Sequence, residues 1–509
     1  VKSGRISRGH RFLCKEDVTI ESPETYKETM RKASVIVDQD ERRDMIRKGL
    51  LAKAEELGGN VWHNADLLEE INYLVEYPTP LYGRIDEEFL KLPVPAVVTP
   101  MRDHQRYYPV RNEDGSLMPY FLTVRNGGTK AIHNVQIGNE RVLRARLDDA
   151  KFFFENDRKK SLEGHREDLT RINYQERMGT MLDKADRLQK LSDFICDGWN
   201  LSADEKADAE RAAYLSKSDL ATGMVTEFTE LQGEMGKEYA LLDGEKKNVA
   251  QAIFEQYMPR FAGDILPQES IGRVLSMADK LDNLAATFLR GLIPTGSQDP
   301  FALRRQTIGA VNILTDGGIH WDIREGIRKA LELLPGEKEA KETALGQIEE
   351  FFRQRIKAIM LDEGIAYDII DAVLAGPVDD IEALFLKARA MAESQLKDET
   401  DLRQAVTRLA NITKDKEGGA VDPSLFEVEY EKNLQAALDE VKAEVLPLYK
   451  EYQYGKALAS LKKLTAPIND YLDNVMVMVD DEKVKANRVS QLISALDLFR
   501  AWGDFSKLV

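Results

Sequence analysis

Near its end the chain reads Asp470-Tyr471-Leu472-Asp473-Asn474-Val475-Met476-Val477-Met478, and then Asn487-Arg488-Val489. From there apolar side chains recur at positions i, i+3, i+4, i+7 and i+10, the spacing of one buried helix face. They are Val489, Leu492, Ile493, Leu496 and Phe499. The pattern predicts a closing helix docked on a helical core. Arg488, Gln491 and Arg500 are then expected off the apolar stripe, on a solvated basic edge.

The composition indicates a folded, helix-rich chain. Its 509 residues are 43% hydrophobic and 31% charged, and this length predicts about three or four domains. The 71 basic and 88 acidic side chains give a formal charge of -17, which opposes non-specific attraction to any polyanion. A nucleic-acid site would therefore be a local basic face on an acidic body, and no DNA partner is expected.

Cysteine usage and hydropathy indicate a cytoplasmic protein without a membrane partner. Only Cys14 and Cys196 occur, without a Cys-x-x-Cys pair, which fits a reducing compartment. No apolar run approaches the roughly 20 residues that span a bilayer, and no signal sequence is apparent. The chain starts at Val1 without an initiator methionine, so we expect a fragment.

Residues 1–140 are predicted to form a mixed α/β domain. Strands are expected at residues 35–37, 95–98 and 119–124, a helix over 40–57, and a hairpin tip at 112–115. Residues 101–108 place Arg102 and Arg106 among a histidine and two tyrosines. This set suits a phosphate or ribose edge, and it equally fits a polar strand edge that leads into a hairpin.

Helical patterns dominate from residue 138 onward. One face of the helix over 138–154 is expected to hold Val142, Ala145, Ala150, Phe153 and Phe154, with Arg141, Arg144 and Arg146 elsewhere. Further along, Asp299 as N-cap and Pro300 at the first helical position predict a helix start. Arg304 and Arg305 then lie one turn in, where they meet RNA or a partner subunit, or form ordinary surface ion pairs.

A helical connector and a last domain complete the chain. Residues 320–395 are expected to be the connector, broken at 334–336 and 375–377 by Pro and Gly. In the domain over 396–509, the first helix has a buried stripe of Leu402, Ala405, Val406 and Leu409. Its polar face carries Arg403, Thr407, Asn411 and Lys414, which suits either RNA contact or a solvated surface.

Several of these segments, taken in order, resemble the beta subunit of the bacterial two-subunit glycyl-tRNA synthetase. The resemblance is carried by residues 5–12, the helix from Asn139, residues 299–305 and the C-terminal stretch. That last stretch resembles the end of DALR-type anticodon-binding domains, which also occur in arginyl and cysteinyl synthetases. Family members have a longer N-terminus, which implies a missing upstream domain.

The resemblance implies a glycine-tRNA ligase that works as an α₂β₂ complex. The alpha subunit is implied to hold the catalytic centre and to use ATP and Mg²⁺, while this chain binds no cofactor, supplies no catalytic residue and grips tRNA(Gly). Candidate tRNA contacts in the anticodon domain are Arg403, Thr407, Arg408, Asn411, Lys414 and Arg488. Candidate contacts to tRNA or the alpha subunit are Arg102, Arg106, Arg141, Arg144, Arg304 and Arg305.

Residues 141–319 resemble the HD phosphohydrolase fold that the family carries, with a degenerate metal site. Active members hold a divalent metal with a His-Asp pair and further ligands. Here Ser218 replaces the histidine beside Asp219, with Asp279 and Asp282 as possible companions, so we expect a structural domain without metal. Two alternatives stay open: a metal-dependent phosphohydrolase using these three aspartates, and an assembly scaffold without tRNA affinity of its own.

Overall fold

The computed structural model describes residues 4–296, 298–394 and 400–508, which form two compact units. The first unit comprises the chain up to Ile172 together with Leu215–Phe254. The second comprises Asn173–Tyr214 and the chain from Glu255 onward. Helices α8 (Ala203–Leu215) and α11 (Lys247–Glu255) end where the chain passes between the units. Within the described ranges, no helix combines the length and hydropathy that a membrane crossing requires.

A four-stranded antiparallel sheet lies at the centre of the first unit, in the order β3-β5-β6-β4. Its strands are β3 (Asn60–Val61), β4 (Pro78–Arg84), β5 (Tyr108–Arg111) and β6 (Leu117–Asn126). The strand predicted at 119–124 and the hairpin tip at 112–115 are confirmed, since the Asn112 amide donates to the Ser116 carbonyl at 2.9 Å. A separate pair is formed by β1 (Ile6–Arg8) and β2 (Asp17–Thr19).

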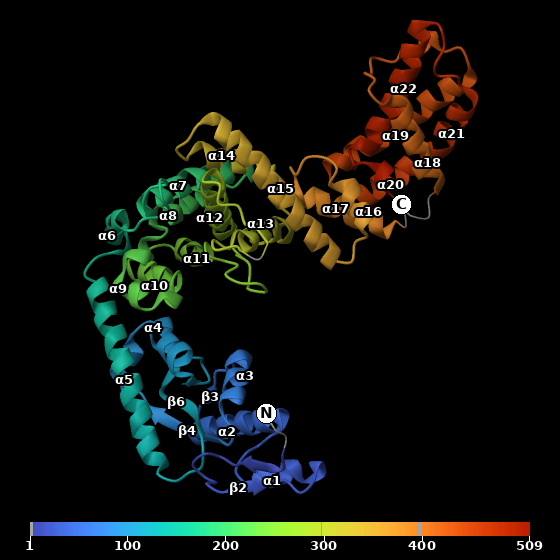
Figure 1. Cartoon of the computed structure of the whole chain (residues 1–509). Helices are drawn as coiled ribbons and strands as arrows, with labels where there is room; N and C mark the ends of the chain where they lie inside the picture. The colour runs from blue at the N-terminus through green and yellow to red at the C-terminus, as the bar shows by residue number, and fades with distance from the viewer. Residues whose placement is uncertain (1–3, 297, 395–399, 509) are drawn as a thin grey trace. The chain divides into compact units, whose positions relative to one another are not determined.

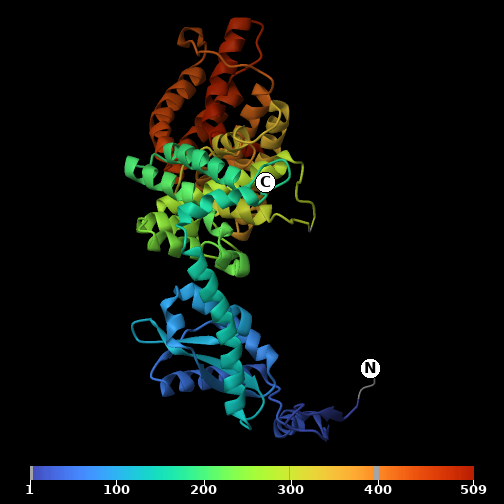
Figure 2. The ribbon, with the colours of Figure 1, turned by 90° about the vertical axis from the view of Figure 1, so that its left-hand side faces the viewer.

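Helices α2 (Gln39–Glu56) and α3 (Ala65–Leu74) pack on this sheet and bury its core. The core residues of the two helices and the sheet include Ile46, Leu50, Ile71, Val110 and Leu122. Helix α5 (Ile132–Asp157) contacts β4, and Figures 1 and 2 show it running beside the sheet. The other helices of this unit are α1 (Tyr26–Lys32), α4 (Val94–Thr99), α6 (Leu162–His165), α9 (Gly223–Glu227) and α10 (Glu234–Leu242).

Two expected strands of the first unit are wrong. Residues 35–37 form a loop, in which Val35 donates to the Met30 carbonyl and Ile36 to the Glu76 carbonyl, each at 2.9 Å. Residues 95–98 lie in α4, which has proline in its first turn. Proline fixes φ near the helical value where its missing N–H costs nothing, and this local constraint overrides the strand preference of the valines.

The face predicted for α5 is confirmed at Ala150, which is buried, and wrong at Val142 and Ala145. Its buried apolar residues are Leu143, Leu147 and Ala150, whereas Val142 is 47% exposed and Ala145 is exposed. Leu143, Leu147 and Ala150 follow the i, i+4, i+7 spacing of one helix face. The sequence therefore contains the pattern of the buried face, which begins at Leu143, one residue after Val142 on the predicted face. The helix also runs across the predicted domain boundary at residues 140/141.

Helix α12 (Ser270–Leu289) forms the centre of the second unit. It contacts helices on several sides: α7 (Met181–Gly198), α13 (Leu303–Gly317), α14 (Ile323–Glu332) and α15 (Lys338–Asp362). The helix is buried on most sides, as expected at the centre of a unit, and Val274, Leu281 and Leu284 are at most 1% exposed. The predicted breaks at 334–336 and 375–377 are confirmed by the gaps before α15 and between α16 (Tyr367–Val373) and α17 (Ile381–Glu393).

The last part of the second unit is a bundle of five helices, drawn in orange and red in Figure 1. They are α18 (Thr400–Thr413), α19 (Glu429–Lys450), α20 (Tyr454–Leu461), α21 (Thr465–Asn474) and α22 (Glu482–Arg500). Both predicted apolar stripes are confirmed, because Leu402 and Leu409 on α18 and Leu492 and Phe499 on α22 are fully buried. The two helices pack against each other.

Candidate functional site

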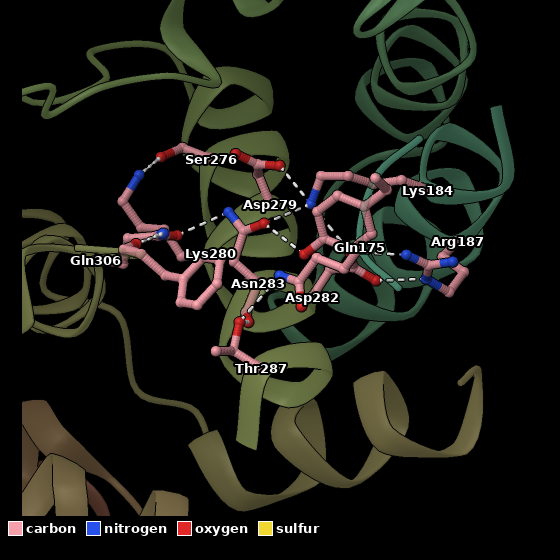
Figure 3. A network of polar contacts seen from close by, with 12 residues as sticks. Gln175, Lys184, Arg187, Ser276, Asp279, Lys280, Asp282, Asn283, Thr287 and Gln306 are labelled. Carbon is pink, nitrogen blue, oxygen red and sulfur yellow. Dashed lines mark hydrogen bonds and ion pairs between the residues drawn. The ribbon is translucent and has the colours of Figure 1, made fainter. Parts of the chain in front are cut away.

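A buried network of charged and amide side chains joins α7 to α12 (Figure 3). The ammonium nitrogen of Lys184 lies 2.9 Å from an oxygen of each of Asp279, Asp282 and Asn283. Arg187 donates from Nε to the other carboxylate oxygen of Asp282 at 2.6 Å. Asp279, Asp282 and Asn283 lie on one side of α12 because three or four residues make one helical turn. Three oxygens thus converge on a lysine ammonium group.

The charges of this network compensate one another. Burial alone would raise the pKa of Asp282, but Lys184 and Arg187 hold it below its ordinary value. Burial alone would lower the pKa of Lys184, but Asp279 and Asp282 raise it above its ordinary value. Two cations therefore face two carboxylates, which is the pairing that buried charge requires.

Amide and hydroxyl groups extend the network to neighbouring segments (Figure 3). Asn283 accepts from the Tyr174 hydroxyl at 2.8 Å and donates to Gln306 on α13 at 2.7 Å. Gln175 donates to the Thr287 hydroxyl at 3.1 Å. The network therefore fixes α12 relative to α7, α13 and the loop before α7. Lys184 and Arg187 were missed by the sequence reasoning, although two basic residues on a mostly buried helix signal a buried acidic partner.

The four residues assigned to a degenerate metal site are divided between the two units. Ser218 and Asp219 belong to the first unit, and Asp279 and Asp282 belong to the second. Asp219 is buried and accepts from the Gly233 amide at 2.7 Å. The residues do not fit a divalent metal, because the Lys184 ammonium already lies against the oxygens of Asp279 and Asp282. The described ranges hold no cluster of three His, Cys, Asp or Glu suited to a metal.

Arg488 is buried, and its expected position on a solvated edge is wrong. It donates to Glu431 at 2.8 Å, to Glu427 at 2.8 Å and to the Met476 carbonyl at 2.9 Å. Gln491, one turn later, donates to the Glu431 carbonyl at 2.7 Å. Helix α19 packs against the side of α22 that carries Arg488 and Gln491. These polar residues therefore form a second contact face of α22, beside its apolar stripe. The guanidinium group of Arg488 therefore joins segments inside the bundle and is not exposed to a bound tRNA.

The polar face of α18 is divided between internal and exposed groups. Arg403 donates to the Leu508 carbonyl at 3.3 Å, and the Thr407 hydroxyl donates to the Arg403 carbonyl at 2.8 Å. Arg408 forms a half-exposed ion pair with Asp473 at 2.8 Å, while Asn411 and Lys414 are exposed. Arg408 and Asn411 on α18, together with Lys414 directly after its last residue, form what we call the exposed edge of α18, and this edge is the candidate RNA surface of the bundle.

The basic candidates of the first unit are mostly ion-paired. Arg102 pairs with Asp103 at 2.6 Å, Arg106 with Glu70 at 2.7 Å, and Arg144 with Asp86 at 2.8 Å. Arg141 on α5 is exposed and forms no ion pair within the described ranges. Surface pairs of this kind are weak and exchangeable, so these arginines stay candidates for contact with tRNA or the alpha subunit.

Arg304 and Arg305 lie in the first turn of α13, which begins at Leu303 instead of Pro300. The carboxylate of Asp299 accepts the amides of Leu303 at 2.8 Å and Arg304 at 2.9 Å. The N-cap position itself is Ala302, so the predicted N-cap and the predicted helix start are both three residues early, although the Asp299 carboxylate does bond to the first turn. The side chain of Arg304 turns back to the Gly296 carbonyl at 2.6 Å, and Arg305 is exposed.

Comparison with known proteins covers nearly the whole chain. A family model described as "Glycyl-tRNA synthetase beta subunit" matches residues 1–375, and one described as "DALR anticodon binding domain" matches residues 402–500. The glycine--tRNA ligase beta subunit of Clostridioides difficile is 45% identical over 508 residues, which are 100% of this chain and 74% of that protein. The beta subunits of Desulforamulus reducens and Bacillus subtilis are 42% and 41% identical, with the same shares covered. This chain therefore belongs to the glycyl-tRNA synthetase beta subunit family.

Proposed function

We propose that this chain is the tRNA-binding beta subunit of a glycine-tRNA ligase. In this proposal it positions tRNA(Gly) for ATP-dependent glycylation by an alpha subunit, and its C-terminal bundle recognises the anticodon. The observation that carries the proposal is the match of the DALR anticodon binding domain to residues 402–500, which span the bundle from α18 to α22. ATP and Mg²⁺ are then used by the alpha subunit, in the cytoplasm, with no DNA or membrane partner.

The exposed edge of α18 suits this role chemically. Lys414 and Arg408 can neutralise phosphates, and the Asn411 amide can donate to and accept from the edge of an unstacked base. Within the described residues Arg408 pairs with Asp473, and an exposed ion pair of this kind is worth at most about 1 kcal/mol, so a phosphate can replace the carboxylate. The chain then contributes to the reaction by orientation, because it holds the acceptor end of the tRNA near the alpha subunit.

The alternative is an assembly scaffold without tRNA affinity of its own. Equilibrium binding distinguishes the proposed tRNA-binding role from the scaffold. The purified chain is titrated with glycine tRNA, and with the same transcript carrying a replaced anticodon, at a series of salt concentrations. The proposal predicts tighter binding of the native anticodon and affinity that falls as salt rises. Absence of binding to both transcripts, with binding to the alpha subunit retained, would favour the scaffold.

A matched pair of variants locates the recognition. Asn411→Ala is expected to cost about 1–3 kcal/mol of binding to the native transcript and less to the altered one, if the amide reads a base. Arg500→Ala is the control, because Arg500 is an exposed residue of the same bundle that pairs only with Asp497 three residues away. Equal losses for both transcripts would mean that Asn411 contacts the backbone only.

A further inference from the structure

A pocket of about 560 Å³ lies in the second unit, between the segment that leads into α13 and the helix α15. Its apolar wall is formed by Phe288, Ile293, Pro294 and Phe351, and its polar side holds Arg304 and Arg355. Helix α15 belongs to the segment 320–395, which was expected to be a helical connector. Arg355 gave no signal there, because an arginine in a Lys- and Glu-rich helix is ordinarily solvated.

The two arginines of this pocket have no carboxylate partner within the described ranges. Arg304 donates to the Gly296 carbonyl, and the guanidinium carbon of Arg355 lies 4.6 Å from the centre of the Phe351 ring. The Nε atom of Arg355 is buried without a hydrogen-bond acceptor. Burial lowers the pKa of Arg355 below its ordinary value, and the nearby positive charge of Arg304 lowers it further, while the Asp299 carboxylate acts in the opposite direction without offsetting them.

The acidic residues nearby are already engaged. Both carboxylate oxygens of Asp299 accept backbone amides at the start of α13. Glu350, which also lines the pocket, pairs with Arg353 at 3.3 Å and accepts from Gln354 at 3.2 Å. In a chain with 88 acidic and 71 basic side chains, two arginines that line one pocket and form no ion pair within the described ranges favour an anionic ligand.

We propose that this pocket binds a phosphate of tRNA, with the adjoining nucleotide against its apolar wall. Two guanidinium groups side by side suit a phosphate, which accepts bidentate hydrogen bonds from each. The aromatic and proline surfaces beside them favour a nucleotide over a carboxylate side chain, because bases and riboses stack on such surfaces. The proposal rests on the proposed function, and it adds a second tRNA contact outside the anticodon bundle.

The test compares Arg355→Ala and Arg304→Ala with the control Lys357→Ala in the full chain. Lys357 lies on α15 like Arg355, is half-exposed and pairs with Asp371 at 2.5 Å. Its replacement by alanine removes one positive charge, as each arginine variant does. Each arginine variant is expected to weaken binding of glycine tRNA roughly tenfold and to reduce the slope of log affinity against log salt by about one. Arg355→Lys should restore part of the affinity, because it keeps the charge and loses the planar fork.

The contact lies outside the anticodon bundle, so the loss for Arg355→Ala should be the same for the native and the anticodon-replaced transcripts. Circular dichroism establishes that each variant is folded, and hydroxyl-radical footprinting should show one tRNA segment that loses protection in Arg355→Ala. Equal affinities for Arg355→Ala and Lys357→Ala, with wild type binding tRNA, would overturn this proposal and leave the proposed function intact.

The proposal would also be overturned if the arginine variants kept their affinity for tRNA and lost binding to the alpha subunit. The arginines would then contact a carboxylate of a partner protein. If the wild-type chain binds no tRNA, both this proposal and the proposed function fail for the isolated chain.

Discussion

Replacing Arg488 by alanine should destabilise the C-terminal bundle. The change removes the cation beside Glu431, whose side chain is 0% exposed, and the donor to the Met476 carbonyl. Removing one partner of a buried ion pair costs about 3–5 kcal/mol. The other carboxylate oxygen of Glu431 keeps its two backbone donors, the amides of Glu427 at 2.7 Å and Val428 at 2.9 Å. We therefore expect the lower end of this range, about 3 kcal/mol.

Amide hydrogen exchange of peptides from α19 and α22 is the suitable assay, because unfolding of a chain of several domains is not a two-state process. A loss of about 3 kcal/mol corresponds to exchange roughly a hundredfold faster in these helices. Arg500→Ala on the same helix is the control, since its exposed pair with Asp497 is worth no more than about 0.5 kcal/mol. Equal exchange rates in the two variants would refute the structural role of Arg488 and return it to the list of tRNA contacts.

Three further predictions concern other parts of the chain. Lys184→Met leaves Asp279 and one oxygen of Asp282 without their cation, so it should destabilise the second unit by about 3–5 kcal/mol. The double variant Lys184→Met with Asp279→Asn should lose less stability, because one unpaired carboxylate is removed. A Lys184→Met variant that melts like wild type in a thermal scan would contradict this. Burial alone would raise the pKa of Glu431, but Arg488 and two backbone amides outweigh it and hold the pKa below its ordinary value of 4.5. The stabilisation from Glu431 is therefore complete above that pH and is lost as pH falls through the lower folded-state pKa. Glu431→Gln should consequently show a shallower loss of exchange protection in α19 as the pH is lowered. The same acid-induced loss in Glu431→Gln and wild type would count against this prediction. Burial raises the pKa of the Cys196 thiol to about 12, so iodoacetamide at pH near 8 should modify the more exposed Cys14 far faster. Equal rates by mass spectrometry would show that α7 opens readily.

Helices were predictable where one apolar stripe decides their burial. Leu402 to Leu409 on α18 and Val489 to Phe499 on α22 form such stripes, and both helices lie as expected. The prediction was wrong where proline chemistry competes with side-chain preference, as in α4. It was also partly wrong in α5, where two apolar faces one residue apart were equally plausible from the pattern alone.

The candidate sites were harder to predict because charge-bearing side chains are defined by partners distant in the sequence. Arg488 is separated from Glu431 by 57 residues, and Arg187 from Asp282 by 95. Periodicity places such residues on a helix face, but only the fold shows whether another helix covers that face. The same limitation hid Arg355, whose environment depends on the segment that leads into α13.

Photo-crosslinking from the anticodon is the most direct test of the account. A glycine tRNA with a photoreactive nucleotide at one anticodon position is irradiated with the chain, and the crosslinked peptide is identified by mass spectrometry. The account predicts crosslinks to peptides within residues 402–500, the part matched by the anticodon binding domain, and foremost to those containing Asn411 or Lys414. Crosslinks confined to the first unit, with none in 402–500, would contradict it.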